Sequence, residues 1–372
     1  MLTPIPCLFM RGGTSRGPFF LDTDLPEDPA LRDRVLLAVM GSPDVRQIDG
    51  LGGAEPLTSK VAIVSRSERP GVNLEFLFAQ VVINEPRVDT TPNCGNMLAG
   101  VAPFAIERGL ISAVDPETTV RILTRNTGTL CDITVQTPGG HITYEGDARI
   151  DGCPGTAAPI RIRFLETAGS VCKSLLPTGH IVDEFNGVRV TCIDNGMPVA
   201  IIAASDLGHT GYESRDQLNQ DHALKRRIEA IRLIAGPAMN LGDVAKKVVP
   251  KMSLVAPPMA GGSLCTRTFI PHECHSAVGV LGAVTVATAA VLEGSIAHAV
   301  AAVPPGPVKL ISVEHPSGEF SVELEMDPAD PQSVRGAALL RTARLIMRGE
   351  VMIPSSVWSG NTLAHRAAVS VR

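Results

Sequence analysis

The stretch Thr90-Thr-Pro-Asn-Cys-Gly-Asn-Met-Leu-Ala-Gly100 opens an apolar run that ends at Gly109. Proline and asparagine interrupt a preceding strand, small polar residues favour a helix start, and glycine favours a helix end. The pattern predicts a helix that starts at about Cys94. At a helix start, unpaired N–H groups and the positive end of the dipole favour a thiolate over a thiol. The alternative is a buried structural thiol, but the position and the neighbouring glycines favour a functional one.

The composition bounds the fold and the partners. The 372 residues are enough for two domains of ordinary size. Apolar residues make up 44% of the sequence and aromatic residues only 3%, so we expect aliphatic cores. The formal net charge of −5 is well mixed along the chain, which argues against nucleic acid as the main partner.

The N-terminal segment and the cysteines favour a cytoplasmic protein. Segment 5–10 is apolar without a basic region or a cleavage site, so we expect no signal peptide. No long uncharged apolar run predicts a membrane span, and the nearest candidate, 278–292, is predicted to be a buried helix. The eight cysteines lack paired spacing, and His, Asp and Glu form no ligand-spaced cluster, so we expect no disulfide framework and no metal site.

Two features of the first half are candidates for ligand binding and acid/base chemistry. Arg11-Gly-Gly-Thr-Ser-Arg-Gly17 is predicted to be a turn whose N–H groups, hydroxyls and arginines suit a carboxylate, although an ordinary hairpin turn with solvated arginines is the alternative. Lys60 opens an apolar strand. A lysine there is usually a surface residue, but if desolvated its pKa falls and it can act as a base.

The remaining elements follow from turn residues and apolar periodicity. In the first half we expect one helix at 29–40 and strands at 4–10, 18–21, 57–64, 74–83, 120–123, 131–136, 142–144 and 161–164. In the second half we expect strands at 188–193 and 199–204, a helix at about 221–234, a further strand at 249–255 and a long apolar helix that starts within 271–276 and ends at 293–294.

From about residue 186 the chain repeats the pattern of its first half. Val249-Pro-Lys-Met-Ser-Leu-Val255 matches Thr58-Ser-Lys-Val-Ala-Ile-Val64 almost position for position, and similar matches occur in the same order elsewhere. We infer an internal duplication. Two like halves can face each other across a cleft, each presenting a helix N-terminus to it. Such a cleft would suit a polyanionic ligand and proton transfer beside a carboxylate.

Several motifs together resemble the PrpF family. They are Arg11-Gly-Gly-Thr-Ser-Arg-Gly17, Asp49-Gly-Leu-Gly-Gly53, Thr58-Ser-Lys60, Asn93-Cys-Gly-Asn96 and Asn126-Thr-Gly128, with further similarity at Cys192-Ile-Asp-Asn-Gly-Met-Pro198, Met239-Asn-Leu-Gly-Asp243, Phe269-Ile-Pro-His272 and Glu314-His-Pro-Ser-Gly-Glu319. The resemblance covers nearly the whole chain. Arg16 stands where the familiar form of the first motif has lysine, which keeps the charge.

The resemblance implies an α/β (α+β) fold like that of diaminopimelate epimerase. Such a fold has two pseudo-symmetric halves, each a curled sheet around a central helix, with the active site in the cleft between them. We place the first half at 1–184, the second at 185–350 and a C-terminal segment at 351–372. The tail from Trp358 onward is expected to be loosely held.

The family implies a cofactor-independent isomerase that moves a proton beside a carboxylate or ketone of a di- or tricarboxylate. Within the family, the resemblance implies keto–enol tautomerisation or allylic isomerisation of 4-oxalomesaconate in the breakdown of gallate and related aromatic acids. Cis–trans isomerisation of 2-methylaconitate, or of another aconitate, is the close alternative. A non-catalytic polycarboxylate-binding protein is the alternative of another class. We expect a small-molecule substrate, no nucleic-acid or membrane partner, and a homo-oligomer.

Carried onto this sequence, the resemblance implies Lys60 and Cys94 as the acid/base pair. It does not say which of the two is the base. Cys274, near the equivalent point of the second half, is a possible second acid/base group, since related epimerases use one cysteine from each half. The predicted substrate-binding residues are Arg11, Thr14, Ser15, Arg16, Gly95, Asn96, His275 and Ser276. For His272 and His275 the alternative role is hydrogen bonding in a cap or turn.

Overall fold

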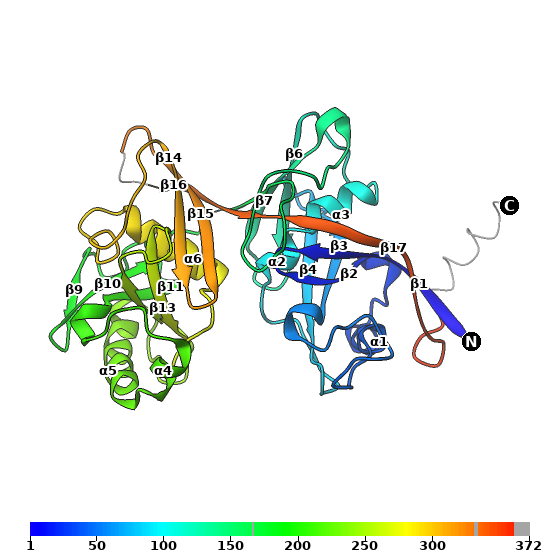
Figure 1. Ribbon diagram of the computed structural model, residues 1–372. Coiled ribbons are helices and arrows are strands. Elements are labelled where there is room, and N and C mark those ends of the chain that lie inside the picture. The colour runs from blue at the N-terminus through cyan, green and yellow to red at the C-terminus, as the bar shows by residue number, and fades with distance from the viewer. Residues whose placement is uncertain (166, 331–333, 361–372) are drawn as a thin grey trace. The chain divides into compact units, whose positions relative to one another are not determined.

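The computed structural model describes residues 1–165, 167–330 and 334–360, and it divides into two compact units (Figure 1). The first unit comprises Met1–Ile162 and Arg341–Arg372, and the second comprises Arg163–Leu340. The division therefore falls before residue 184, and the described part of the C-terminal segment, 351–360, belongs to the first unit.

The first unit begins with a tight hairpin. Strand β1 (Leu2–Gly12) pairs antiparallel with β2 (Ser15–Leu21), and only Gly13 and Thr14 lie between them. The hairpin prediction is confirmed, but the turn is shorter than expected because the strands include Arg11 and Arg16. β17 (Ala343–Pro354) returns along the other side of β1 in antiparallel register. That pairing brings residues 343–354 alongside the first hairpin.

The other elements of the first unit complete a mixed sheet. Two connections in it are parallel, β2 to β3 and β4 to β6, and each is bridged by helix. The elements are η1 (Asp22–Asp24), α1 (Pro29–Met40), η2 (Pro56–Thr58), β3 (Lys60–Arg66), β4 (Leu74–Val81), β5 (Val88–Asp89), α2 (Gly95–Leu98), α3 (Val101–Glu107), β6 (Glu117–Thr124), β7 (Leu130–Gln136) and η3 (Pro138–Gly140). β8 (Ile160–Phe164) lies at the boundary of the units.

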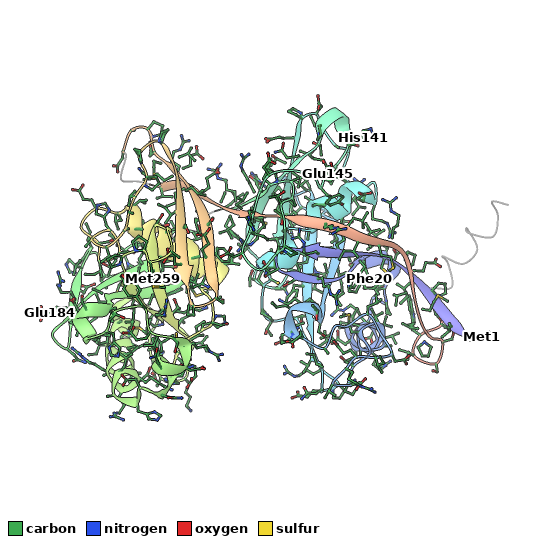
Figure 2. The ribbon with its side chains drawn as sticks, viewed as in Figure 1. Met1, Phe20, His141, Glu145, Glu184 and Met259 are labelled. Carbon is green, nitrogen blue, oxygen red and sulfur yellow. The ribbon has the colours of Figure 1, made fainter. Side chains whose placement is uncertain are left out.

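Helix α1 confirms the helix predicted at 29–40. Asp28 caps it by accepting a hydrogen bond from the Leu31 N–H, and Gly41 ends it in the left-handed conformation. The apolar face packs on an apolar core that includes Phe20, labelled in Figure 2, which is fully buried. Burial of that face holds the helix on the sheet.

The central helix of the first unit starts where the sequence predicts, at Cys94, which is the N-cap of α2. It is interrupted after four residues, and α3 continues it from Val101. Gly100 lies at the junction, where a Cβ atom would come within 2.5 Å of the Phe19 ring. Close packing against β2 therefore accounts for the glycine.

The second unit repeats this order. Its hairpin is followed by helices, a parallel connection from β11 to β12, a further helix, and a parallel connection from β13 to β14. The elements are β9 (Asp183–Phe185), β10 (Val188–Asp194), β11 (Pro198–Ala203), η4 (Ala204–Leu207), α4 (Arg215–Gln220), α5 (His222–Ala238), β12 (Lys251–Ala256), β13 (Leu264–Phe269), α6 (Val280–Val291), β14 (Val308–His315), β15 (Gly318–Met326) and β16 (Val334–Arg341). The predicted duplication is confirmed by the shared strand order and direction.

Three local predictions differ from the structure. Segment 142–144 forms no strand, and the apolar helix α6 starts at Val280, later than the predicted 271–276. Trp358 is held, because it packs on the core of the first unit and its carbonyl accepts a hydrogen bond from the Thr3 hydroxyl at 2.8 Å. The rest of the predicted loose tail, from 361 onward, lies outside the described residues. No helix within the described part of the chain has both the length and the apolar character needed to cross a membrane.

Candidate active site

Lys60 and Cys94 meet in the first unit. The Lys60 ammonium donates a hydrogen bond to the Cys94 sulfur at 3.4 Å. The two residues are only 9% and 8% exposed. Lys60 is therefore not the solvated surface residue of the alternative reading, and Cys94 is a thiol in direct contact with an ionisable amine. A buried amine and thiol in contact can exchange a proton, which is the elementary requirement of an acid/base pair.

The start of β3 places Lys60. β3 runs parallel to β2, and Gly17 of β2 packs so closely that a Cβ atom would lie 1.8 Å from the Lys60 carbonyl oxygen. On its other side the ammonium lies over the ring of Phe78, 5.5 Å from the centroid. A glycine and an aromatic ring therefore fix the position of the lysine.

The segment before Cys94 is held by the Asn126 side chain. Its amide donates hydrogen bonds to the carbonyl oxygens of Phe78 and Thr90, at 2.8 and 2.6 Å, and its carbonyl accepts one from the Phe78 N–H at 2.9 Å. This accounts physically for the Asn126-Thr-Gly128 motif. The asparagine ties the β6–β7 turn to the segment that carries the thiol.

The turn of the first hairpin packs against the residue two places after the thiol. The Asn96 amide donates to the Thr14 hydroxyl at 2.9 Å and to the Ser15 hydroxyl at 3.5 Å. Cβ atoms at Gly12 and Gly13 would lie 2.4 and 2.2 Å from Asn96 oxygens. Only glycines permit this approach, so the turn and the helix start form one small polar cluster.

The structure gives the two predicted arginines of this turn different surroundings. Arg11 donates through Nη1 to the Gly13 carbonyl and to both the carbonyl and the hydroxyl of Thr342, at 2.7, 3.2 and 2.9 Å. Arg16 lies over the Phe9 ring at 5.8 Å. Arg11 thus fastens the turn to the returning chain, and its role toward a substrate stays a prediction.

Two further residues of the site were missed by the sequence reading. Cys153 donates a hydrogen bond from its thiol to the Gly13 carbonyl at 3.2 Å. Arg341 is 6% exposed, and burial lowers the pKa of its guanidinium to about 10, while Cys153 and Cys94 act in the opposite direction. No local motif marks either residue, because the chain path alone brings them to the turn.

The described residues of the second unit show no lysine–cysteine contact like that between Lys60 and Cys94. Cys274 lies in a bridge to Phe269 of β13, not at a helix start, and its side chain belongs to an aliphatic core. Its N–H donates to Asn219 Oδ1 at 2.6 Å, and burial raises the pKa of its thiol to about 11. Unlike Cys94, Cys274 does not lie at a helix start, because the segment continues from β13 as a turn and α6 begins at Val280 after its N-cap, Gly279. A role for Cys274 as a second acid/base group stays a prediction.

The neighbours of Cys274 that the sequence proposed for binding take part in turns. His275 Nδ1 lies 3.0 Å from the Ala277 N–H, as expected for a turn histidine. The Ser276 carbonyl accepts from the Ser317 hydroxyl at 2.6 Å, and His272 pairs with Glu229 at 3.6 Å. Neither His275 nor Ser276 lies at the start of α6, so their predicted place beside helix N–H groups is not found.

Among the described residues no group of three or more His, Cys, Asp or Glu side chains is arranged to hold a metal ion. The chemistry that the first-unit site offers directly is proton transfer between an amine and a thiol, with hydroxyls and an amide beside them.

Comparison with known proteins agrees with the family resemblance of the motifs. A family model described as "PrpF protein" matches residues 2–354. The chain is 59% identical to the (4E)-oxalomesaconate Delta-isomerase of Novosphingobium sp. (strain KA1), covering 94% of this chain and 97% of the relative. It is 55% identical to the 4-oxalomesaconate tautomerase of Pseudomonas putida (strain KT2440), covering 96% and 98%.

The fold is that of a solved structure, the methylitaconate-delta-isomerase. The two superpose with a TM-score of 0.86 at 35% sequence identity, covering 98% of this chain and 99% of that one. This agreement supports the epimerase-like α+β class that the motifs implied. With the family model matched over almost the whole chain, the protein belongs to the PrpF family.

Proposed function

We propose that the protein is a cofactor-independent isomerase that shifts a proton within 4-oxalomesaconate, by keto–enol tautomerisation or the equivalent allylic isomerisation. The contact between Lys60 Nζ and Cys94 Sγ carries the proposal. A purely binding protein has no need of a buried amine and thiol held together. The two relatives above 50% identity whose names specify this substrate support the choice.

In the proposed reaction one member of the pair removes a proton from the carbon next to the keto or carboxyl group. The C–H bond breaks and its electrons enter a dienolate. The other member then delivers its proton to the far carbon of that system. Each turnover leaves one excess proton on the first group, and the 3.4 Å contact lets it pass directly to the second. The pair is thus restored without a cofactor.

The residues around the pair suit the anionic substrate. The first N–H groups of a helix lack partners within it, so those of Gly95 and Asn96 are available to a developing oxyanion. The hydroxyls of Thr14 and Ser15 converge on the Asn96 amide and offer donors for a carboxylate. We assign these four residues to substrate binding.

Isomerisation of 2-methylaconitate is the second candidate. A relative named 2-methyl-aconitate isomerase, from Shewanella oneidensis (strain MR-1), is 35% identical over 94% of this chain. The lower identity places this substrate behind 4-oxalomesaconate, although the same pair would serve both.

The test is turnover of both substrates in buffered deuterium oxide, followed by ultraviolet absorbance and NMR. Rapid conversion of 4-oxalomesaconate with deuterium at one defined carbon is expected. Turnover of 2-methylaconitate alone would transfer the protein to the second candidate. If neither reacted and both merely protected Cys94 from iodoacetamide, the protein would be a polycarboxylate binder.

We also propose a cytoplasmic, homo-oligomeric protein. All eight cysteines are free thiols, which suits a reducing compartment. Cell fractionation and sedimentation measurements test the two statements separately.

A further inference from the structure

The loop between α1 and β3 contains a buried residue in a strained backbone conformation. Gln47 is 1% exposed and has a φ of 46°, in the left-handed region that residues other than glycine rarely adopt. Ala54, later in the same loop, has a φ of 60°. Such residues persist only where surrounding contacts hold them, and they cluster at functional sites. The contacts of Gln47 therefore indicate what the strained loop does.

Every polar group of the Gln47 amide has a partner. Its Nε2 donates hydrogen bonds to the hydroxyls of Ser42 and Ser59, at 3.0 and 2.7 Å. Its Oε1 accepts one from the Ala54 N–H at 3.0 Å. A glutamine amide offers two N–H bonds and one carbonyl oxygen, so these contacts use all of them and fix the orientation of the amide.

The glycines of the Asp49-Gly-Leu-Gly-Gly53 motif fit around this amide. A Cβ atom at Gly52 would lie 2.2 Å from Gln47 Oε1. At Gly53 a Cβ atom would lie 2.5 Å from the Thr58 hydroxyl, and the Gly53 N–H donates to the Thr58 carbonyl at 3.2 Å. The motif thus encloses the amide on one side and packs against the chain just before β3 on the other.

Ser59 connects the amide to the start of β3. It is fully buried, and its hydroxyl, which accepts from Gln47, donates in turn to the Val81 carbonyl at 2.7 Å. The Ser59 carbonyl accepts from the Val81 N–H at 3.1 Å. Lys60 comes next in the chain and opens the antiparallel ladder with β4, opposite Gln80. A chain of hydrogen bonds from amide to hydroxyl to carbonyl therefore fixes the residue next to the lysine.

The second unit holds the matching segment differently. Pro250 stands where the first unit has Ser59, and proline has no hydroxyl to join such a chain. There the buried side chain of Arg232 donates instead to the carbonyl oxygens of Lys247 and Val249, at 3.1 and 3.2 Å. The chain through serine is thus not a shared feature of the duplicated fold. It occurs in the unit that has the lysine–thiol contact.

We propose that Gln47 is a positioning residue that, through Ser59, holds Lys60 in contact with Cys94. The ammonium and the sulfur lie 3.4 Å apart, so a small shift at the start of β3 would break their hydrogen bond. Gln47 itself exchanges no proton. The inference rests on the proposed function for its effect on catalysis, but the contact that it explains exists without a substrate.

The first test compares crystal structures of the wild type and Gln47→Met, in which an apolar side chain of similar length replaces the amide. We expect Lys60 Nζ and Cys94 Sγ to move beyond hydrogen-bonding distance in the variant. Thr137→Val is the control, because it removes another buried hydrogen bond of the first unit, to the Val114 carbonyl, and should leave the contact intact. An unchanged contact in Gln47→Met overturns the proposal. If that variant does not fold, Ser59→Ala breaks the same chain and takes its place.

The second test separates positioning from stability by kinetics on 4-oxalomesaconate. Gln47→Met should lower kcat about 10- to 100-fold, the usual cost of a misplaced catalytic group, and change KM much less. Adding Ser59→Ala should cause little further loss, since both changes break one chain. Thr137→Val should lower the unfolding temperature with kcat unchanged. A wild-type kcat in Gln47→Met, or fully additive losses in the double variant, contradicts the proposal.

Gln47→Glu gives a readout that a purely structural role would not move. A protonated carboxyl group can donate to Ser59 and accept from Ala54 as the amide does, whereas a carboxylate only accepts. Relative to the wild type, kcat of Gln47→Glu should therefore fall as the pH rises between about 5 and 9, and that of Gln47→Met should stay level. A Gln47→Glu ratio that is level and as low as that of Gln47→Met would overturn the role of the hydrogen-bond chain. A wild type that turns over neither candidate substrate would sink the proposed function, and the crystal structures would still decide this inference.

Discussion

The two units share strand order and direction but differ in their chemistry. In the first unit the lysine that opens β3 contacts a thiol at 3.4 Å. In the second unit Lys251 opens the matching strand β12, and burial lowers the pKa of its ammonium. Its Nζ lies 3.5 Å from the position that a Cβ atom of Gly279 would occupy. The lysine is retained by the duplication, while glycine stands at the start of α6 where Cys94 stands at the start of α2.

The difference shows that a duplicated fold can keep the same strand order while the side chains at matched positions make different contacts. Cys274 is 1% exposed, and its N–H and carbonyl are both bonded to side chains of α4, Asn219 and Arg215. The second-unit thiol thus packs into an apolar core, whereas the first-unit thiol accepts a hydrogen bond from a lysine. We expect substitutions at matched positions to have unequal effects.

Substitution of the two matched lysines, Lys60 and Lys251, should give the largest difference between the units. Lys60→Met removes one partner of the proton transfer, and we expect kcat to fall by about 10³ to 10⁴. Lys251→Met should lower kcat less than about tenfold, because no thiol hydrogen bond is recorded for it in the described residues. Steady-state kinetics on 4-oxalomesaconate measure kcat of both variants, with circular dichroism as the folding control. Equal losses in both variants would contradict the asymmetry.

Substitution of the two cysteines, Cys94 and Cys274, should have a smaller effect on kcat than substitution of the lysines. Cys94→Ala is expected to lower kcat by about 10² to 10³ while leaving the unfolding temperature nearly unchanged. Cys274→Ala should leave kcat unchanged and lower the free energy of unfolding by about 1 kcal/mol, since it leaves a small cavity. Activity lost with Cys274 and kept without Cys94 would reverse the assignment of roles.

The sequence predicted most helices and strands of the two units, but not every helix boundary. Residues with a local signature were placed correctly, as with the Asp28-capped α1 and the Cys94 helix start, because caps and apolar periodicity act within a few residues. The start of α6 was misplaced because proline and polar residues at 271–276 favour a helix start, whereas the structure has a turn there and the N-cap at Gly279. Periodicity alone cannot separate a buried turn from a first helical turn.

The parts of the site that could not be predicted depend on long-range pairing. Cys153 contacts the hairpin turn through its hydrogen bond to the Gly13 carbonyl, and the β1–β17 ladder, which ends at Ala343, brings Arg341 near the same turn. Neither lies in a motif, and nothing in their neighbours along the chain indicates a site. The Lys60–Cys94 contact, by contrast, was predicted through family resemblance, not through spacing.

Alkylation rates sharpen the comparison of the thiols. Burial raises the pKa of Cys274 to about 11, so its thiolate should be a minor species well below that pH. Near pH 8 we expect Cys94 to label at least about tenfold faster than Cys274. Peptide mapping after brief iodoacetamide treatment of the native protein measures both, and labelling after denaturation is the control. Faster labelling of Cys274 would contradict its burial.

A pair of glycines beside the two lysines gives the smallest expected effect. At Gly17 a Cβ atom would lie 1.8 Å from the Lys60 carbonyl oxygen, and backbone cannot move aside as a flexible side chain can. Gly17→Ala should therefore lower the free energy of unfolding by about 1–3 kcal/mol and displace Lys60 from the thiol.

At Gly279 the new atom would meet only the Lys251 ammonium, at an ordinary 3.5 Å, and the backbone has a φ of −66° that alanine adopts freely. Gly279→Ala should cost less than about 1 kcal/mol, the usual scale of an N-cap change. Denaturant unfolding of both variants measures the contrast. Equal costs would mean that the start of β3 is no more tightly packed than the start of α6, and the physical basis for a fixed lysine in the first unit alone would be lost.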